Sequence, residues 1–74
     1  DIDAEVLELV VDSKSQICNK KISAINFPRE TVVGAIVRSG KVVLPKGNVI
    51  IKAGDDVVIF SQPESIPQIE SLFA

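Results

Sequence analysis

The fold is decided by residues 34–60, GAIVRSGKVVLPKGNVIIKAGDDVVIF. Runs of valine and isoleucine alternate in it with short breaks rich in glycine, proline, asparagine and aspartate. Branching at Cβ suits extended strands, and the residues at the breaks favour turns. Ser39-Gly40 has the composition of a two-residue hairpin turn. The stretch therefore predicts a hairpin of residues 31–38 and 41–44, a short apolar segment at 49–51 and a strand at 56–60.

Gly34 lies inside the first strand of this predicted hairpin. A glycine in a strand has no side chain to pack, and such positions often mark a β-bulge or a close approach by another backbone. We therefore expect one of these two features at Gly34.

Three further elements lie outside this stretch. Residues 4–11, AEVLELVV, are largely apolar and predict a first strand. Cysteine and isoleucine side chains recur at helical intervals within residues 16–25, which predicts a short helix. A second helix is expected from residue 64 onwards, where Ser65 and Gln68 have the spacing of a capping box. The predicted fold class is α+β: an antiparallel sheet of about four strands with two helices on one face, in the order β-α-β-β-(β)-β-α.

Size and charge limit the partners that the chain can have. With 74 residues it forms one domain, and a domain of this size leaves about 40% of its unfolded surface exposed, so self-association is expected to stabilise it. The net charge of −2 argues against nucleic acid, because phosphate neutralisation needs a strongly basic surface.

Cys18 is the only cysteine, so the chain has no internal disulfide and fits a reducing compartment. No apolar run approaches the ~20 residues that span a bilayer, and the acidic first residues do not resemble a signal peptide. We expect a cytoplasmic domain. Because the chain opens on Asp1 without methionine, we also expect it to be a piece of a longer protein.

The sequence offers no catalytic or metal site. It has no histidine, the commonest general base and metal ligand, and Cys18 has no histidine to lower its thiol pKa. Asp55 and Asp56 follow Gly54, but adjacent strand residues point to opposite faces and do not converge on one metal ion. We expect a turn in which an aspartate carboxylate accepts hydrogen bonds from nearby backbone N–H groups. The chain is predicted not to be an enzyme.

A positive cluster is the remaining candidate for binding. Residues 31–54 contain Arg38, Lys41, Lys46 and Lys52 and no acidic residue. Arg38 and Lys41 flank the hairpin turn, where both could reach an anionic ligand, Arg38 through a planar bidentate fork. Basic residues at strand ends also serve solubility and discourage edge pairing, so charge alone leaves both interpretations open.

Three blocks together resemble the TrkA C-terminal (RCK C-terminal) domain family. They are Gly34-Ala35-Ile36-Val37-Arg38, then Val43-Leu44-Pro45 with Gly47-Asn48, and finally Gly54-Asp55-Asp56-Val57-Val58-Ile59-Phe60. The similarity extends over nearly all of residues 1–74, and it implies a single, non-enzymatic regulatory domain of potassium channel and transporter systems. Nucleotide binding of the NAD or ATP kind would belong to a Rossmann domain that this chain does not contain.

The resemblance also implies partners and site residues. Members of the family form homodimers, act on a membrane potassium channel or transporter subunit through the parent protein, and in some cases bind a small anionic effector such as cyclic di-AMP between two subunits. The implied location is cytoplasmic, peripheral to or tethered to the inner membrane through the parent protein. The alternative is a small-ligand sensor attached to a different ion transporter or antiporter. The implied ligand-binding residues are Arg38, Lys41 and Pro45, with walls formed by Val37, Val43 and Leu44; Arg38 could instead brace the dimer.

Overall fold

A computed structural model describes residues 4–74. Four strands form one antiparallel sheet in the order β1-β4-β2-β3. The strands are β1 (Glu5–Val10), β2 (Thr31–Arg38), β3 (Lys41–Val43) and β4 (Asp56–Ser61). The chain ends in a 3-10 turn, η2 (Pro63–Ser65), and the helix α1 (Ile66–Phe73). The predicted α+β class and the four-stranded antiparallel sheet are confirmed.

The predicted first helix, within residues 16–25, is wrong. The structure has a series of turns there and only the 3-10 helix η1 (Ile22–Ala24). The backbone of this segment pairs instead with residues 47–51: the Asn19 amide donates to the Ile51 carbonyl at 2.7 Å, and the Ile51 amide donates to the Lys20 carbonyl at 2.9 Å. These bonds satisfy the backbone N–H and C=O groups of the segment without a helix. The apolar residues are spaced as in a helix, but the spacing only brings their side chains into the protein interior.

The same pairing explains the outcome for residues 49–51, the short apolar segment written as (β) in the predicted order. Residues 49–51 form no strand of the sheet, and their only β-type pairing among the described residues is an isolated bridge between Lys21 and Ile50. Only three of the four residues expected in the second hairpin strand belong to β3. The sheet therefore has a short edge strand at β3.

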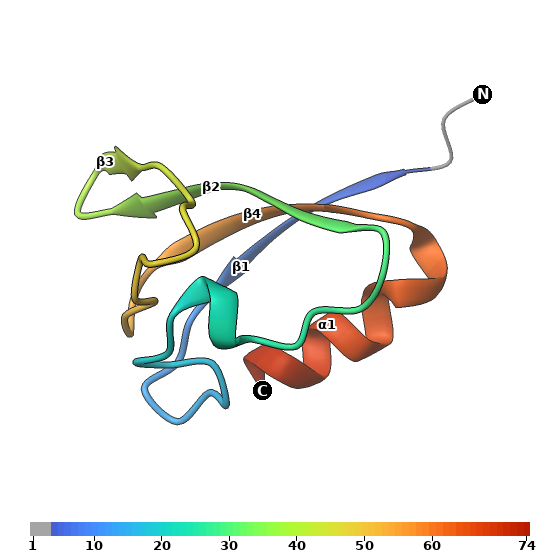
Figure 1. Ribbon diagram of the computed structural model, residues 1–74, viewed down its shortest axis with the longest axis horizontal. Helices are drawn as coiled ribbons and strands as arrows, with labels where there is room; N and C mark the ends of the chain where they lie inside the picture. Colours follow the sequence, from blue (N-terminus) through green and yellow to red (C-terminus); the bar gives the residue numbers. More distant parts are fainter. Residues whose placement is uncertain (1–3) are drawn as a thin grey trace.

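One face of the sheet carries the core. Figure 1 shows α1 and the long connection from β1 to β2 on the same side of the sheet. Val57 and Ile59 of β4 lie fully buried between the neighbouring strands and α1, whose contribution is Ile69 and Phe73. The remaining fully packed side chains come from β2 and from the connections, and they are Val11, Ile17, Ile36 and Ile51.

The bulge expected at Gly34 is confirmed, whereas the close neighbour there is the Phe60 side chain and not another backbone. The pairing of β2 with β4 shifts register between Val33 and Ala35, which is a bulge. A Cβ atom added at Gly34 would overlap the ring of Phe60. The hairpin turn is also confirmed, with Ser39 at φ 51° and Gly40 at φ 76°, the left-handed values of a tight β-hairpin.

No helix among residues 4–74 is long and apolar enough to cross a bilayer.

Candidate functional site

The side chain of Arg38 is held by an internal partner at the end of β2. Its Nε donates to Asp55 Oδ1 and its Nη2 to Asp55 Oδ2, both at 2.8 Å. Nη2 also donates to the Ile50 carbonyl at 2.8 Å. Asp55 Oδ2 accepts a further bond from the Lys52 amide at 2.8 Å. The pair thus ties the end of β2 to the loop that leads into β4.

Burial makes this contact more than a surface ion pair. The side chain of Asp55 is 1% exposed and that of Arg38 35% exposed. Hydrogen bonding from Arg38 is the main cause that lowers the pKa of Asp55, and the Lys52 amide and the Arg38 charge add to it against the opposing effect of burial. Asp55 is therefore a carboxylate at neutral pH, and Arg38, whose own pKa is raised chiefly by the bond to Asp55, is its counter-ion.

This arrangement determines which N–H donors of Arg38 are available to a ligand. A guanidinium has five N–H donors, and the contacts with Asp55 and Ile50 use the Nε–H and both hydrogens of Nη2. The Nη1 amino group is the part not engaged by these contacts. The bidentate fork expected from the sequence points at Asp55, so a ligand role for Arg38 stays a prediction and is limited to Nη1.

The other five predicted ligand residues do not share one surface. Lys41 is exposed and lies opposite Arg38 across the hairpin, and Leu44 beyond it is 65% exposed. Val43 lies opposite the fully buried Ile36 on the core side. The adjacent pair in the ladder, Val37 with Val42, faces the opposite side.

Pro45, the last of the five, is half-buried where the chain leaves β3. The structure therefore brings Arg38 and Lys41 together at the hairpin tip and separates Val37 from Val43.

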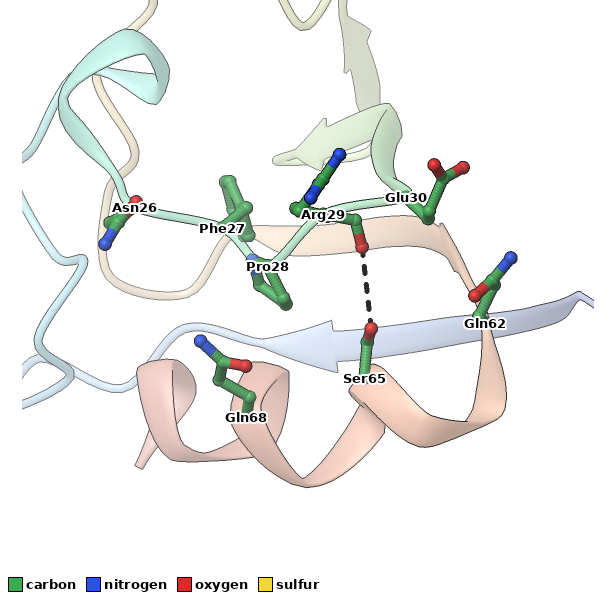
Figure 2. A pocket seen from close by; sticks show the side chains of 8 residues that line it. All are labelled: Asn26, Phe27, Pro28, Arg29, Glu30, Gln62, Ser65 and Gln68. Atoms are coloured by element: carbon green, nitrogen blue, oxygen red, sulfur yellow. Dashed lines mark hydrogen bonds between the residues drawn. The ribbon is translucent and has the colours of Figure 1, made fainter.

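A surface hollow lies away from the hairpin. Figure 2 shows it between the connection 26–30 and the start of α1, with the Pro28 ring directed toward the helix and the Arg29 and Glu30 side chains directed away from it. Its volume is about 470 Å³. The hydroxyl of Ser65 lies 3.5 Å from the Arg29 carbonyl and bridges the two walls. None of the predicted ligand residues lines this hollow; its walls are Asn26, Phe27, Pro28, Arg29, Glu30, Gln62, Ser65 and Gln68.

Two features of these regions were missed or misjudged from the sequence. The predicted capping box is wrong, because Ser65 makes no side-chain bond to the N-terminus of α1. Asp55 does accept a backbone N–H bond as expected, but its pairing with Arg38 was missed. A signal existed in principle: Arg38 is the last residue of a strand, and Asp55 stands just before the strand that pairs with it.

The fold, a four-stranded antiparallel sheet with a C-terminal helix, agrees with what comparison with known proteins shows. The family model of the TrkA-C domain matches residues 6–74. The chain belongs to the TrkA-C domain family.

Two relatives illustrate the range of the family. A Trk system potassium uptake protein TrkA homolog 2 from Methanosarcina mazei is 36% identical over 70 residues, which cover 95% of this chain and 16% of the relative. The Trk system potassium uptake protein TrkA of Haemophilus influenzae is 35% identical over 74 aligned residues and is covered to the same 16%. The chain thus spans about a sixth of the length of these relatives.

A solved structure described as an RCK domain with cda has the same fold. It superposes with a TM-score of 0.76 over 90% of this chain and 96% of that chain, at 17% sequence identity. The predicted resemblance to the TrkA C-terminal or RCK C-terminal domain is confirmed.

Proposed function

We propose that this chain is a regulatory domain of a potassium uptake or channel system that dimerises and binds a small anionic effector. The single observation that supports it most is the match to the TrkA-C family over residues 6–74, together with relatives named as Trk potassium uptake proteins. The RCK structure of the same fold is described with cda, which favours a cyclic dinucleotide as the first effector to test.

The hairpin β2–β3 is the surface that fits this role best. Its outer strand β3 ends the sheet, so its outer backbone groups are available to a second copy. Lys41 is exposed beside it, and Val42 and Leu44 are 67% and 65% exposed. Two hairpins that meet at this edge would place two copies of Lys41 and of Arg38 Nη1 around a common anion.

Regulation requires that the effector bind two states with different affinity. The Arg38–Asp55 pair holds the hairpin end against the loop 50–55. An effector between two copies would favour the assembled state, and the parent protein would transmit that preference to the transported ion's path.

The experiment combines sedimentation with calorimetry on the 74-residue chain. We expect a dimer at high micromolar concentration that Leu44→Asp dissociates, and heat on titration with cyclic di-AMP. Lys41→Ala should weaken effector binding at least tenfold, the loss expected for a hydrogen bond to a charged group. Lys14→Ala, an exposed lysine of the β1–β2 connection, is the matched control and should leave binding unchanged.

A monomer throughout the concentration range would remove the dimerisation part of the proposal. Absence of heat with cyclic di-AMP, or equal binding by Lys41→Ala and wild type, would remove this effector and this site. Arg38→Ala is unsuitable as the binding test, because it also leaves Asp55 without its counter-ion.

A further inference from the structure

The side of the sheet that faces away from α1 is uncovered in residues 4–74 (Figure 1). Five of its side chains are large and apolar, namely Val6, Val10, Val32, Val42 and Phe60, and each is between 45% and 67% exposed. Val6, Phe60 and Val32 are directly opposite one another across β1, β4 and β2. We call this surface the open face. An apolar surface of this continuity usually marks an interaction site.

Among residues 4–74, the strands place two carboxylates and no basic side chain on the open face. Glu8 lies opposite Val58, and Asp56 is two residues from Val58 on the same side of β4, so the two acids are diagonal neighbours within reach of each other. The neighbouring Asp56 carboxyl raises the pKa of Glu8, because it can accept a hydrogen bond from the protonated form and repels the charged form. Arg38, at the end of β2, is engaged with Asp55 instead.

The carboxylate of Asp56 lacks a hydrogen-bond donor for one of its two oxygens. Its Oδ1 is shielded from solvent and has no hydrogen-bond partner among the described residues. A shielded carboxylate oxygen without a donor is costly. A positive charge placed close to the carboxylate would stabilise its charged form.

We propose that the open face is the docking surface of a basic amphipathic helix from a partner polypeptide, whose apolar stripe covers the valines and Phe60 and whose arginine or lysine meets Glu8 and Asp56. Charge decides among the classes of occupant. Lipid headgroups and nucleic acid are anionic and would be repelled by the pair, and a second open face would bring two further carboxylates against it. A basic segment alone combines apolar contact with charge of the opposite sign.

The dimensions suit a helix. Strands of six residues extend about 20 Å at ~3.4 Å per residue, which a helix of about 13 residues matches at 1.5 Å per residue. A helix with side chains is ~10 Å across, about the width of two strand spacings. The opposite face already packs α1 through Ile69 and Phe73, and helices on both faces of a sheet are a stable layer arrangement.

The test uses two synthetic 14-residue peptides as probes. Both have leucine at positions i, i+3, i+4 and i+7 and a polar opposite side; one carries arginine inside the stripe and the other carries glutamate. Binding to the 74-residue chain is measured by anisotropy of a fluorophore on each peptide at pH 7. We expect the arginine peptide to bind more than tenfold tighter, because like charges across an interface are strongly unfavourable.

Variants then assign the contact. Glu8→Gln combined with Asp56→Asn should reduce the preference for arginine to about twofold or less, since the charge contrast disappears. Val32→Ser should weaken both peptides. Ile50→Ser is the matched control, because Ile50 is an exposed isoleucine outside the sheet, and it should leave both affinities unchanged. If the double variant does not fold by circular dichroism, Glu8→Gln alone, on the edge strand, should lower the preference in the same direction.

Three results would overturn the proposal. The first is no binding of either peptide at millimolar concentration. The second is binding without the expected specificity, meaning that the two peptides bind equally or that Val32→Ser does not change their affinity. The third is a wild-type dimer that Val32→Ser dissociates and Leu44→Asp does not, which would make a second copy the occupant. None of these results depends on Lys41 or on cyclic di-AMP, so the effector site at the hairpin succeeds or fails separately.

Discussion

Arg38→Ala should destabilise the domain strongly, because it removes the counter-ion of a buried carboxylate. The substitution deletes two hydrogen bonds to Asp55 and one to the Ile50 carbonyl. Asp55 would keep only the bond from the Lys52 amide, with its side chain 1% exposed. The expected loss is the cost of leaving a buried charge unpaired.

The magnitude follows from burial. Removing one partner of a fully buried pair costs about 3–5 kcal/mol. Because the Arg38 side chain is 35% exposed, water can partly replace it, and we expect about 3 kcal/mol, the low end of that range. A 74-residue domain has a total stability of roughly 4–11 kcal/mol, so the variant should be folded but fragile.

The assay is urea unfolding followed by far-ultraviolet circular dichroism, since the chain has no tryptophan or tyrosine for fluorescence. With an m-value of about 1 kcal/mol/M for a small domain, the midpoint should fall by about 3 M urea. Replacing both partners, as Arg38→Met with Asp55→Leu, should recover most of the loss, because an apolar pair leaves no buried charge. A loss below about 1 kcal/mol for Arg38→Ala would refute the reasoning, as that is the value of a surface ion pair.

The pair also predicts how stability depends on pH. The pKa of Asp55 is lowered in the folded state relative to its ordinary value of 3.8, so the unfolded state binds the proton first as the pH falls. The stabilisation is fully present above the unfolded pKa and is lost as the pH falls through the folded pKa. Asp55→Asn should therefore be less stable than wild type at pH 7, and the difference should shrink steadily below about pH 4. A constant difference from pH 7 to pH 2 would contradict the assignment.

Three further predictions test the sheet and the chain end. Gly34→Ala should cost about 1–3 kcal/mol in the same unfolding assay through overlap with the Phe60 ring, and Phe60→Leu in the same chain should recover part of it; an unchanged midpoint would mean that the bulge relaxes freely. Ser15→Ala should cost about 1–3 kcal/mol, because the buried Ser15 hydroxyl donates to a carbonyl of the last turn of α1 at 2.6 Å; Ser13→Ala, on an exposed neighbour, is the control. Glu8→Gln should raise the melting temperature at pH 7 and not at pH 3, because the raised pKa of Glu8 beside Asp56 means that its charged form is disfavoured in the folded state; an equal effect at both pH values would exclude charge repulsion as the cause.

The local sequence was enough to predict the strands and their turns. Valine and isoleucine runs, Gly34, and the turn at Ser39 and Gly40 carry their information within a few residues, and the structure has the bulge and the left-handed turn where they were expected. The helical spacing in residues 16–25 predicted the wrong element, because the backbone of that segment pairs with residues 47–51, a contact that no local pattern reveals.

The sequence by itself determined the sheet-forming segments, the absence of histidine and of a second cysteine, and the family of the domain. Only the tertiary structure decided that the guanidinium of Arg38 binds the Asp55 carboxylate through two hydrogen bonds. It also decided that Val37 and Val43 face opposite sides of the sheet, and that Glu8 and Asp56 are neighbours among exposed valines. The physical reason is that a strand's side chains alternate between two faces, while the register of pairing decides which side chains from distant strands become neighbours.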